Sequence, residues 1–375
     1  MKRSELQLFA LLQSGLWDRP ADIGLFTGTV DWELILTLAK VQTVTGVLYD
    51  GICRLPVRLQ PPTAVMRTLY LTVVRIERSH ELLNSCLAEI VPQLEAEGIR
   101  PVLLKGQGVA QNYPNPLRRQ CGDIDLYVGK DNCNRAMQII LDLGAKPQVN
   151  LPAKSPKHES FYWGEVSIEL HFLVEKLRNP IYNKRFQQWV SYRFAADNLR
   201  TWNLKETVIH LPPTDFDAIY IFNHAFHHFI TGGIGLRQLC DWAMFLHTFS
   251  DKIDRSELLK KLRAFGILKP WQVFGCIVVD YLGLPKEEFS FYNPNETRHR
   301  QRIVQDILSV GNFGFHNPDN FMRPDNYLAG KLHSFKNRLR RFYKLYPVFP
   351  KQVSFYCVSF IYTGIKQIVK DLLKI

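Results

Sequence analysis

The chain has few cysteines, and they are not spaced as a disulfide framework or a zinc site requires. The seven are Cys53, Cys86, Cys121, Cys133, Cys240, Cys276 and Cys357. They are scattered, odd in number and without a Cys-x-x-Cys pair. This pattern fits reduced thiols in a cytoplasm and argues against disulfide-rich secreted proteins and cysteine-ligated zinc modules.

Long apolar segments are missing as well. The longest candidate, residues 353–364, is shorter than the roughly 18 to 20 apolar residues of a membrane-spanning helix. Residues 1–6 show neither the apolar run nor the small-residue cleavage site of a secretory signal. We therefore expect a cytoplasmic protein with no transmembrane segment.

Acidic residues are scarcer than basic ones, and the imbalance lies mostly at one end. The net charge is +12, yet residues 326–375 hold ten Lys or Arg against one Asp, which leaves only about +3 for the first 325 residues. The 46% hydrophobic and 22% charged shares are typical of a globular protein, here long enough for two or three domains.

Two carboxylates follow a glycine-containing turn in the first third of the chain. The apolar run 101–104 has strand length and leads into Lys105-Gly106-Gln107-Gly108, where glycine permits a tight turn. The chain then returns as residues 123–128, in which Asp123 and Asp125 alternate with aliphatic residues. Alternation places both carboxylates on one face of a strand.

A third carboxylate stands in a matching context. Residues 166–172 also alternate, which places Ser167, Glu169 and His171 on one face. Carboxylates that lie close together repel each other unless a cation neutralises them, and Mg²⁺ prefers such ligands. We expect Asp123, Asp125 and Glu169 to hold two Mg²⁺ ions, with Mn²⁺ as an alternative; a solvated acidic strand end is the plainer interpretation.

These motifs, taken in order, resemble a known superfamily. They are Lys105-Gly106, Tyr113, Arg119, Asp123-Ile124-Asp125 and Ile168-Glu169-Leu170-His171. The set is similar to the nucleotidyltransferases with a DNA polymerase beta type of core, and more narrowly to the bacterial branch of uncharacterised nucleotidyltransferases. The resemblance covers under a fifth of the chain.

The resemblance implies a catalytic site and a substrate. Asp123, Asp125 and Glu169 would bind the metals, and the turn Gly106-Gln107-Gly108 would lie against the triphosphate of a nucleotide such as ATP. The superfamily has Gly followed by Ser or Gly, whereas Gln107 follows Gly106 here. That departure leaves backbone contacts from the turn but removes a side-chain contact.

Several polar residues near the carboxylates have both a functional and a structural interpretation. Lys105 could neutralise phosphate charge or be a solvated lysine at a strand end. Arg119 could pair with a phosphate, brace Asp123 or lie on the surface. His158 and His171 could contact substrate or be structural, and His171 shares the face of Glu169.

The rest of the chain reads as helical, so we expect an α+β or α/β fold with a small mixed sheet between helical regions. The expected divisions are 1–98 helical, 99–205 catalytic, 206–325 helical and 326–375 a basic, aromatic tail. In the third region His224 and His228 lie four apart, as do Arg237 and Asp241. We favour a polar helix face over a metal pair for the histidines. Arg237 and Asp241 would form an ion pair within the helix or face the cleft.

Helix signals in the first hundred residues give more detailed expectations. Asp31 should cap a helix from Trp32 through Leu48, with Leu34, Leu38, Val41 and Leu48 on its apolar face. A second helix should start at a Thr63 cap, and Pro92 should bend or interrupt it. Thr214 should similarly open a later helix with a capping pattern.

The sequence thus predicts a magnesium-dependent enzyme that transfers a nucleoside monophosphate from a nucleoside triphosphate to a hydroxyl group, releasing pyrophosphate. The acceptor stays open between a small molecule, a protein and an RNA end. A catalytically silent nucleotide-binding or partner-binding protein is one alternative. The other is a protein that binds nucleic acid or an anionic membrane surface through the basic tail.

Overall fold

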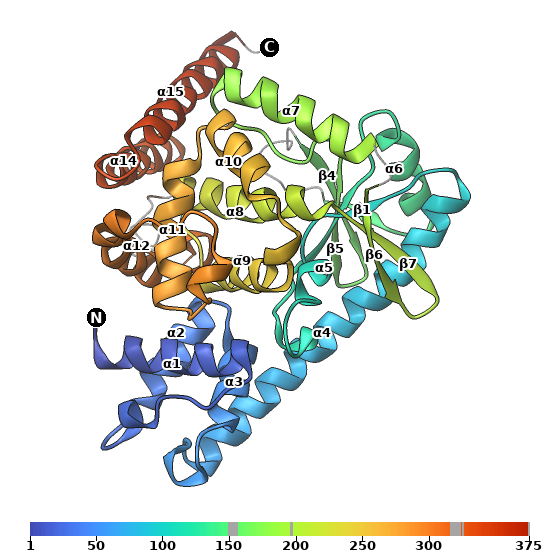
Figure 1. The fold of residues 1–375 in the computed structure, drawn as a ribbon. Helices are drawn as coiled ribbons and strands as arrows, with labels where there is room; N and C mark the ends of the chain where they lie inside the picture. The colour runs from blue at the N-terminus through green and yellow to red at the C-terminus, as the bar shows by residue number, and fades with distance from the viewer. Residues whose placement is uncertain (149–156, 196–197, 316–323, 325, 374–375) are drawn as a thin grey trace.

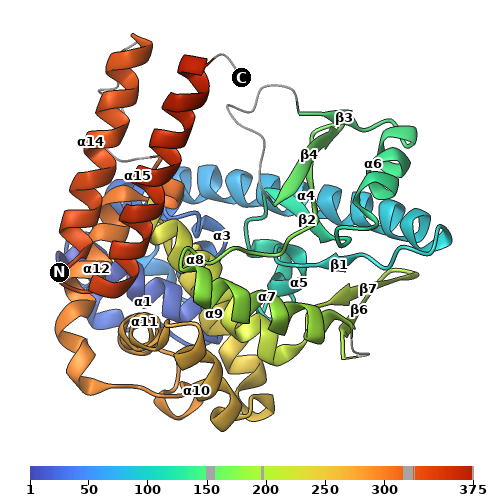
Figure 2. The ribbon, with the colours of Figure 1, turned by 90° about the horizontal axis from the view of Figure 1, so that it is seen from above.

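A seven-stranded mixed sheet forms one side of the molecule. The computed structural model describes residues 1–148, 157–195, 198–315, 324 and 326–373 (Figures 1 and 2). The strands are β1 (Val102–Leu103), β2 (Asp123–Tyr127), β3 (Lys146–Pro147), β4 (His158–Trp163), β5 (Val166–His171), β6 (Arg200–Leu204) and β7 (Thr207–Leu211). Their order is β3-β4-β5-β2-β1-β7-β6. β2 pairs parallel with β5, whereas β4 and β5 form an antiparallel hairpin.

Helices account for most of the remaining described chain. They are α1 (Arg3–Trp17), α2 (Trp32–Val41), α3 (Thr45–Cys53), α4 (Thr63–Ala96), α5 (Gln107–Ala110), α6 (Cys133–Asp142), α7 (Pro180–Ala195), α8 (Thr214–Thr231), α9 (Leu236–Phe249), α10 (Arg255–Ala264), α11 (Leu268–Asp280), α12 (Thr297–Val310), α14 (Tyr327–Leu345) and α15 (Pro350–Leu373). A mixed sheet with flanking helices confirms the predicted fold class.

The aliphatic face of the central strands is covered by α4 and α6. Ile124 on β2 and Ile168 on β5 pack in one buried cluster with Leu87 and Ile90 of α4 and Ala136 of α6. Burying this face leaves the alternate side chains, which carry the carboxylates, facing the opposite way, toward α8 and α9.

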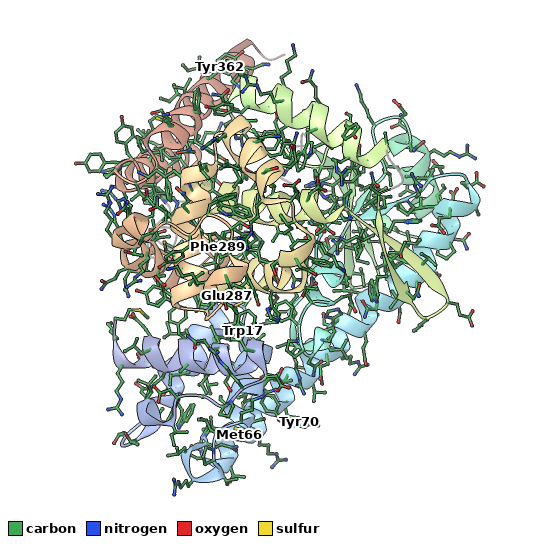
Figure 3. The ribbon with its side chains drawn as sticks, in the orientation of Figure 1. Trp17, Met66, Tyr70, Glu287, Phe289 and Tyr362 are labelled. Carbon is green, nitrogen blue, oxygen red and sulfur yellow. The ribbon has the colours of Figure 1, made fainter. Side chains whose placement is uncertain are left out.

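A second core joins the two ends of the chain. Leu8 and Leu11 of α1 belong to the same buried cluster as Trp242 of α9 and Phe349, which precedes α15. Figure 3 shows Phe289 among these helices, and its ring packs edge-on against Trp242. The N-terminal helices therefore support the C-terminal helical region as well as the sheet.

The helix expected from Trp32 through Leu48 is in fact two helices. Asp31 does cap α2, its carboxylate accepting from the Leu34 amide at 3.0 Å. α2 ends at Val41, however, and Thr43 takes a left-handed conformation (φ 55°) before α3 begins. The predicted apolar face was right only in part: Leu48 is buried and Leu38 packs half-buried on the core, but Leu34 is exposed. Ile35 and Ala39 are the buried residues of α2.

Of the two effects expected of Pro92, an interruption is absent, because α4 continues past it to Ala96. Proline cannot donate to the carbonyl four residues earlier, here that of Ala88. The Thr207 hydroxyl of β7 donates to this carbonyl at 3.2 Å instead. The helices expected to start at Thr63 and Thr214 do begin at these residues, but Pro62 and Pro213 occupy the cap positions.

The middle of the basic tail is part of the core. Phe342 and Leu345 near the end of α14 and Val353 near the start of α15 are buried, and Arg341 pairs with Asp306 of α12 at 3.0 Å. α14 and α15 lie side by side, and their other ends project from the body (Figure 2). Within the described residues, no helix has the length and apolar character needed to cross a membrane.

Candidate active site

The register of two parallel strands brings the three predicted carboxylates together. Asp125 lies opposite Glu169, and Asp123 lies opposite Ser167 on β5. Because this pairing is in phase with the alternation of side chains, all three carboxylates emerge on one face. Ligating oxygens of Asp123, Asp125 and Glu169 lie within 4.8 Å of one another. This is an arrangement of hard oxygen ligands that suits Mg²⁺.

Asp125 is the buried centre of the group. Lys105 Nζ lies 2.9 Å from its Oδ2, and His171 Nε2 donates to its Oδ1 at 2.9 Å. Burial opposes ionisation, but Lys105 and His171 outweigh it and hold the pKa of Asp125 well below its usual range. Asp125 is therefore a carboxylate at neutral pH.

Asp123 experiences the opposite balance. The charge of Asp125 raises the pKa of Asp123, burial raises it further, and Lys105 only partly compensates. The pair thus stores electrostatic repulsion that a bound cation would relieve.

Both predicted histidines lie beside Glu169. His171 Nε2 and His158 Nδ1 each lie 3.2 Å from its Oε2, and the two rings are 4.8 Å apart. Burial lowers the pKa of His158. Burial also opposes protonation of His171, but hydrogen bonds to Asp125 and Glu169 raise its pKa.

Of the predicted phosphate-binding turn, only Gly106 lines the cleft. Its backbone (φ 60°, ψ −118°) is one that glycine alone adopts readily. Gln107 and Gly108 are buried instead. A methyl group on Gly108 would come within 2.5 Å of the Leu211 side chain, so this glycine serves the packing of α5 on β7.

Arg119 pairs with Asp241 rather than Asp123. Its guanidinium makes two parallel contacts to that carboxylate, Nε to Oδ1 at 3.0 Å and Nη2 to Oδ2 at 2.6 Å. The Tyr113 hydroxyl donates to the same Oδ1 at 2.7 Å. All three groups are buried, so Arg119 and Asp241 brace the wall of the cleft.

Arg237 consequently has no carboxylate partner within the described chain. One guanidinium nitrogen donates to the Gln120 carbonyl at 2.7 Å, and Nε is buried without a partner. Burial, followed by the charge of Arg119, lowers the pKa of Arg237. Its side chain lines the cleft together with Asp123 and Lys105.

The cleft between the sheet and α8 and α9 holds roughly 1040 Å³, including space open to solvent. Lys105, Gly106, Asp123 and Asp125 line one side of it, and α8, α9 and residues 312–315 complete the wall. It has room for a nucleotide next to the carboxylates.

Sequence comparison now identifies the family. Residues 28–283 match the family described as "Uncharacterised nucleotidyltransferase". The chain belongs to this family. The resemblance inferred from the motifs is thereby confirmed at the level of the family, and the match contains all three carboxylates as well as Arg237.

Other comparisons add little. Among solved structures, the chain is similar to an antigenic nucleotidyltransferase-like protein from Paracoccidioides brasiliensis. The two are 14% identical, with a TM-score of 0.33, over 56% of this chain and 97% of that one. A comparison with curated proteins gave no match.

The motifs of the nucleotidyltransferase family did not reveal every residue in the cleft. Gln238, Asn312, Phe313 and Phe315 also line it, and Gln238 Nε2 donates to Asn312 Oδ1 at 2.9 Å. The signal in the sequence is the pair Gly311 and Gly314 around this segment. In the structure both glycines have positive φ, and so does Phe313 (φ 51°). Strained backbone of this kind clusters at functional sites.

Glu175 is another residue that the sequence motifs did not reveal, and it is the buried partner of His224. Its carboxylate is fully buried and lies 3.0 Å from Lys157 Nζ and 3.3 Å from His224 Nδ1. Burial lowers the pKa of His224 to about 4, so its ring is neutral where it lines the cleft. His224 and His228 are in ring contact at 4.6 Å, but neither belongs to the two candidate metal-ligating groups found in the described chain.

Proposed function

We propose that this protein transfers a nucleoside monophosphate from a nucleoside triphosphate to a hydroxyl acceptor, with Mg²⁺ as its cofactor. The observation that carries the proposal is the convergence of Asp123, Asp125 and Glu169 within 4.8 Å beside a nucleotide-sized cleft. Membership of the nucleotidyltransferase family supports it.

The donor set fits a pair of divalent cations. Asp123 and Asp125 would hold both ions, and Glu169 would share the one nearer the acceptor. When bound, such ions polarise the phosphate and stabilise the attacking and leaving oxygens. The raised pKa of Asp123 supports this assignment, because Asp125 leaves it in need of positive charge.

The reaction exchanges one phosphorus–oxygen bond for another. The acceptor hydroxyl oxygen bonds to the α-phosphorus, and the bond from that phosphorus to the bridging oxygen breaks to release pyrophosphate. We assign the hydroxyl proton to Glu169, whose carboxylate is partly exposed at the edge of the site.

Charge on the triphosphate would be balanced mainly by Arg237, and Lys105, which pairs with Asp125, would add positive charge nearby. Arg119 is less suited to this role because Asp241 already binds its Nε and Nη2. Arg237 lines the cleft with a buried Nε that has no partner, as expected for a phosphate ligand.

One observation favours a second candidate, a nucleotide-binding protein without activity. Lys105 and His171 already neutralise Asp125 without any metal. Such a protein would bind nucleotide but transfer nothing. The acceptor is open in either case, and a small molecule, a protein and an RNA end all remain candidates.

The test is transfer of label from triphosphates labelled at the α-phosphate to fractionated small molecules, protein and RNA. We expect Mg²⁺-dependent labelling of one fraction with pyrophosphate release. Asp123→Asn should abolish it, and Arg237→Gln should weaken triphosphate binding about tenfold to a hundredfold.

Asp131→Asn is the matched control, because Asp131 is an exposed carboxylate just after β2 and should leave transfer unchanged. Transfer by Asp123→Asn at the wild-type rate would overturn the mechanism. Nucleotide binding without any transfer would favour the inactive candidate.

A further inference from the structure

A second polar pocket lies where α8 meets α14 and α15. Its empty volume is about 600 Å³. The polar side chains lining it include Arg178, His227, Arg338, Tyr356, Ser359 and Thr363. Among the described residues that line this pocket there is no carboxylate, and it shares none of its lining with the nucleotide cleft. We call it the arginine pocket.

The two arginines lack carboxylate partners in the described part of the chain. Arg178 lies over the Tyr356 ring at 5.9 Å, and Arg338 lies over Phe360 at 5.7 Å. Neighbouring Arg341, in contrast, is paired with Asp306. Partial burial, then the charges of Arg341 and Arg178, lowers the pKa of Arg338 to about 10, a sign of uncompensated positive charge.

Two further polar groups face the arginines. His227 Nδ1 and the Tyr356 hydroxyl are 2.9 Å apart, which links α8 to α15. Burial lowers the pKa of His227 to about 4, so its ring is neutral. The carboxylate whose charge acts on both groups is Glu175, and it is already held by Lys157 and His224.

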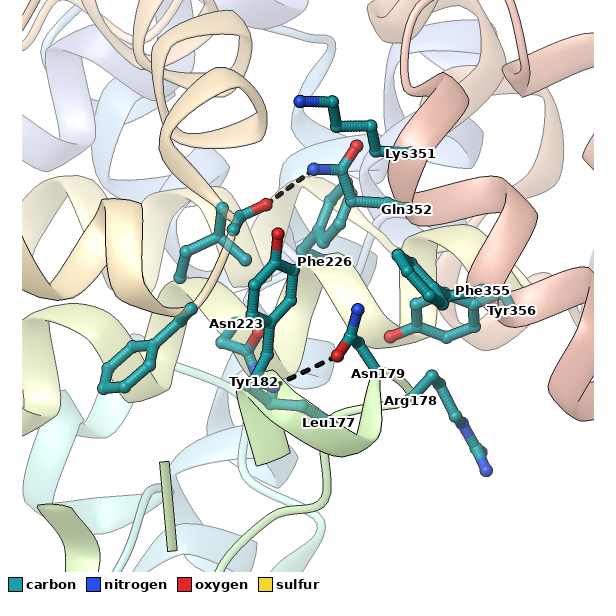
Figure 4. A pocket seen from close by; sticks show the side chains of 13 residues that line it. Leu177, Arg178, Asn179, Tyr182, Asn223, Phe226, Lys351, Gln352, Phe355 and Tyr356 are labelled. Carbon is teal, nitrogen blue, oxygen red and sulfur yellow. Dashed lines mark hydrogen bonds between the residues drawn. The ribbon is translucent and has the colours of Figure 1, made fainter. Parts of the chain in front are cut away.

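An apolar pocket adjoins the arginine pocket and shares Arg178 and Tyr356 with it. Figure 4 shows the rings of Tyr182, Phe226 and Phe355 around this space, with Arg178 extending away from Tyr182. The Gln352 amide there is occupied, because it donates to the Gly266 carbonyl at 2.6 Å. The adjoining pocket therefore offers mainly apolar contacts.

We propose that the arginine pocket binds a phosphate group carried by a molecule with an apolar or aromatic part. Two guanidinium groups, a neutral imidazole and several hydroxyls form a donor set suited to phosphate. The adjoining aromatic pocket takes the rest of the ligand. A soluble phosphomonoester and the headgroup of a phospholipid share this chemistry.

The direct test is calorimetric titration of phenyl phosphate into the full chain without Mg²⁺. We expect saturable binding that weakens about tenfold to a hundredfold in Arg338→Gln and in Arg178→Gln. Arg340→Gln is the matched control, because Arg340 is exposed on α14 outside the pocket and should bind as the wild type does. Arg237→Gln should also bind normally, which separates this site from the nucleotide cleft.

Sedimentation with phosphatidic acid vesicles distinguishes the two sources. Binding to vesicles but not to phenyl phosphate, lost in Arg338→Gln and kept in Arg340→Gln, assigns the site to a lipid headgroup. Equal losses in both variants would mean general surface charge and overturn the site. Loss of phenyl phosphate binding in Arg237→Gln alone, or no binding to either probe, would overturn it as well.

Discussion

Asp241 and Arg119 form a buried ion pair next to the cleft. The two residues are 122 positions apart in the sequence, and the Tyr113 hydroxyl donates a hydrogen bond to the same carboxylate. Burial alone would disfavour the charge on Asp241, but Arg119 keeps the pKa of Asp241 below its usual value. Removing one partner would leave the other charge buried and unpaired.

We predict that Asp241→Asn lowers the free energy of unfolding by about 3 to 5 kcal/mol. Urea denaturation measures the change. Glu97→Gln removes the carboxylate of an exposed ion pair with Arg135 and should leave the urea midpoint unchanged. Equal stability of Asp241→Asn and wild type would show that the pair does not brace the cleft.

At the residue scale, the carboxylate group was predictable and the arginine roles were not. Alternation within two strands identified Asp123, Asp125 and Glu169, because a strand fixes which side chains share a face. The spacing of Arg237 and Asp241 predicted either a pair within one helix or two residues facing the cleft. Both line the cleft, but Asp241 pairs with Arg119, a partner that only the tertiary fold brings near.

At the scale of elements, α3 contacts the segment before Arg119 through a glycine. A methyl group on Gly46 would come within 2.1 Å of the Arg118 carbonyl oxygen. Backbone cannot rotate away as a side chain can, so this approach requires glycine. It fixes the position of the segment that carries Arg119.

We predict that Gly46→Ala destabilises the protein by about 1 to 3 kcal/mol through overpacking. The control is the same substitution at Gly364, which lies exposed in α15 with nothing within 4 Å of an added methyl group. There alanine should stabilise by about 0.5 to 1 kcal/mol, because it favours a helix more than glycine does. Thermal unfolding measures the stability change in both variants. Changes of the same sign would contradict the packing argument.

Elements with a clear period were predictable, and their ends were less so. The two strands that carry the carboxylates, β2 and β5, lie where alternation of side chains predicted them. The interruption expected at Pro92 could not be ruled out locally, because the Ala88 carbonyl accepts a hydrogen bond from Thr207. Thr207 lies more than a hundred residues away in the sequence. The turn at Thr43 misled because a left-handed threonine has no strong local signal.

At the scale of the molecule, both ends of the chain share one core, and several histidines are buried in or beside it. Burial lowers the pKa of His80, His224 and His227 to about 4. An unfolded histidine has a pKa near about 6.5. Between these values the unfolded chain binds more protons, so the stability from neutral histidines is present above about pH 6.5 and is lost as the pH falls. His171 has a raised pKa, so its contribution has the opposite sign and is lost as the pH rises through that pKa.

We predict that the free energy of unfolding drops between pH 7 and pH 5. The drop is up to about 1.4 kcal/mol per pH unit for each of His80, His224 and His227. His80→Gln should remove the contribution of one histidine to the slope of unfolding free energy against pH. Urea denaturation at several pH values measures this slope. His247→Gln, at an exposed site, should keep the wild-type slope. Parallel curves for His80→Gln and wild type would contradict the prediction.

The central claim is that Asp123, Asp125 and Glu169 hold metal for a nucleotide. Thermal unfolding with each of the four nucleoside triphosphates, with and without Mg²⁺, tests this claim and needs no acceptor. We predict that one triphosphate raises the midpoint only with Mg²⁺, by an amount equivalent to about 2.7 kcal/mol at a hundred times its dissociation constant. Asp123→Asn should lose this effect. Its midpoint without ligand should match or exceed that of the wild type, because the substitution relieves repulsion with Asp125. An equal shift in Asp123→Asn, a shift independent of Mg²⁺, or no shift with any triphosphate would contradict the claim.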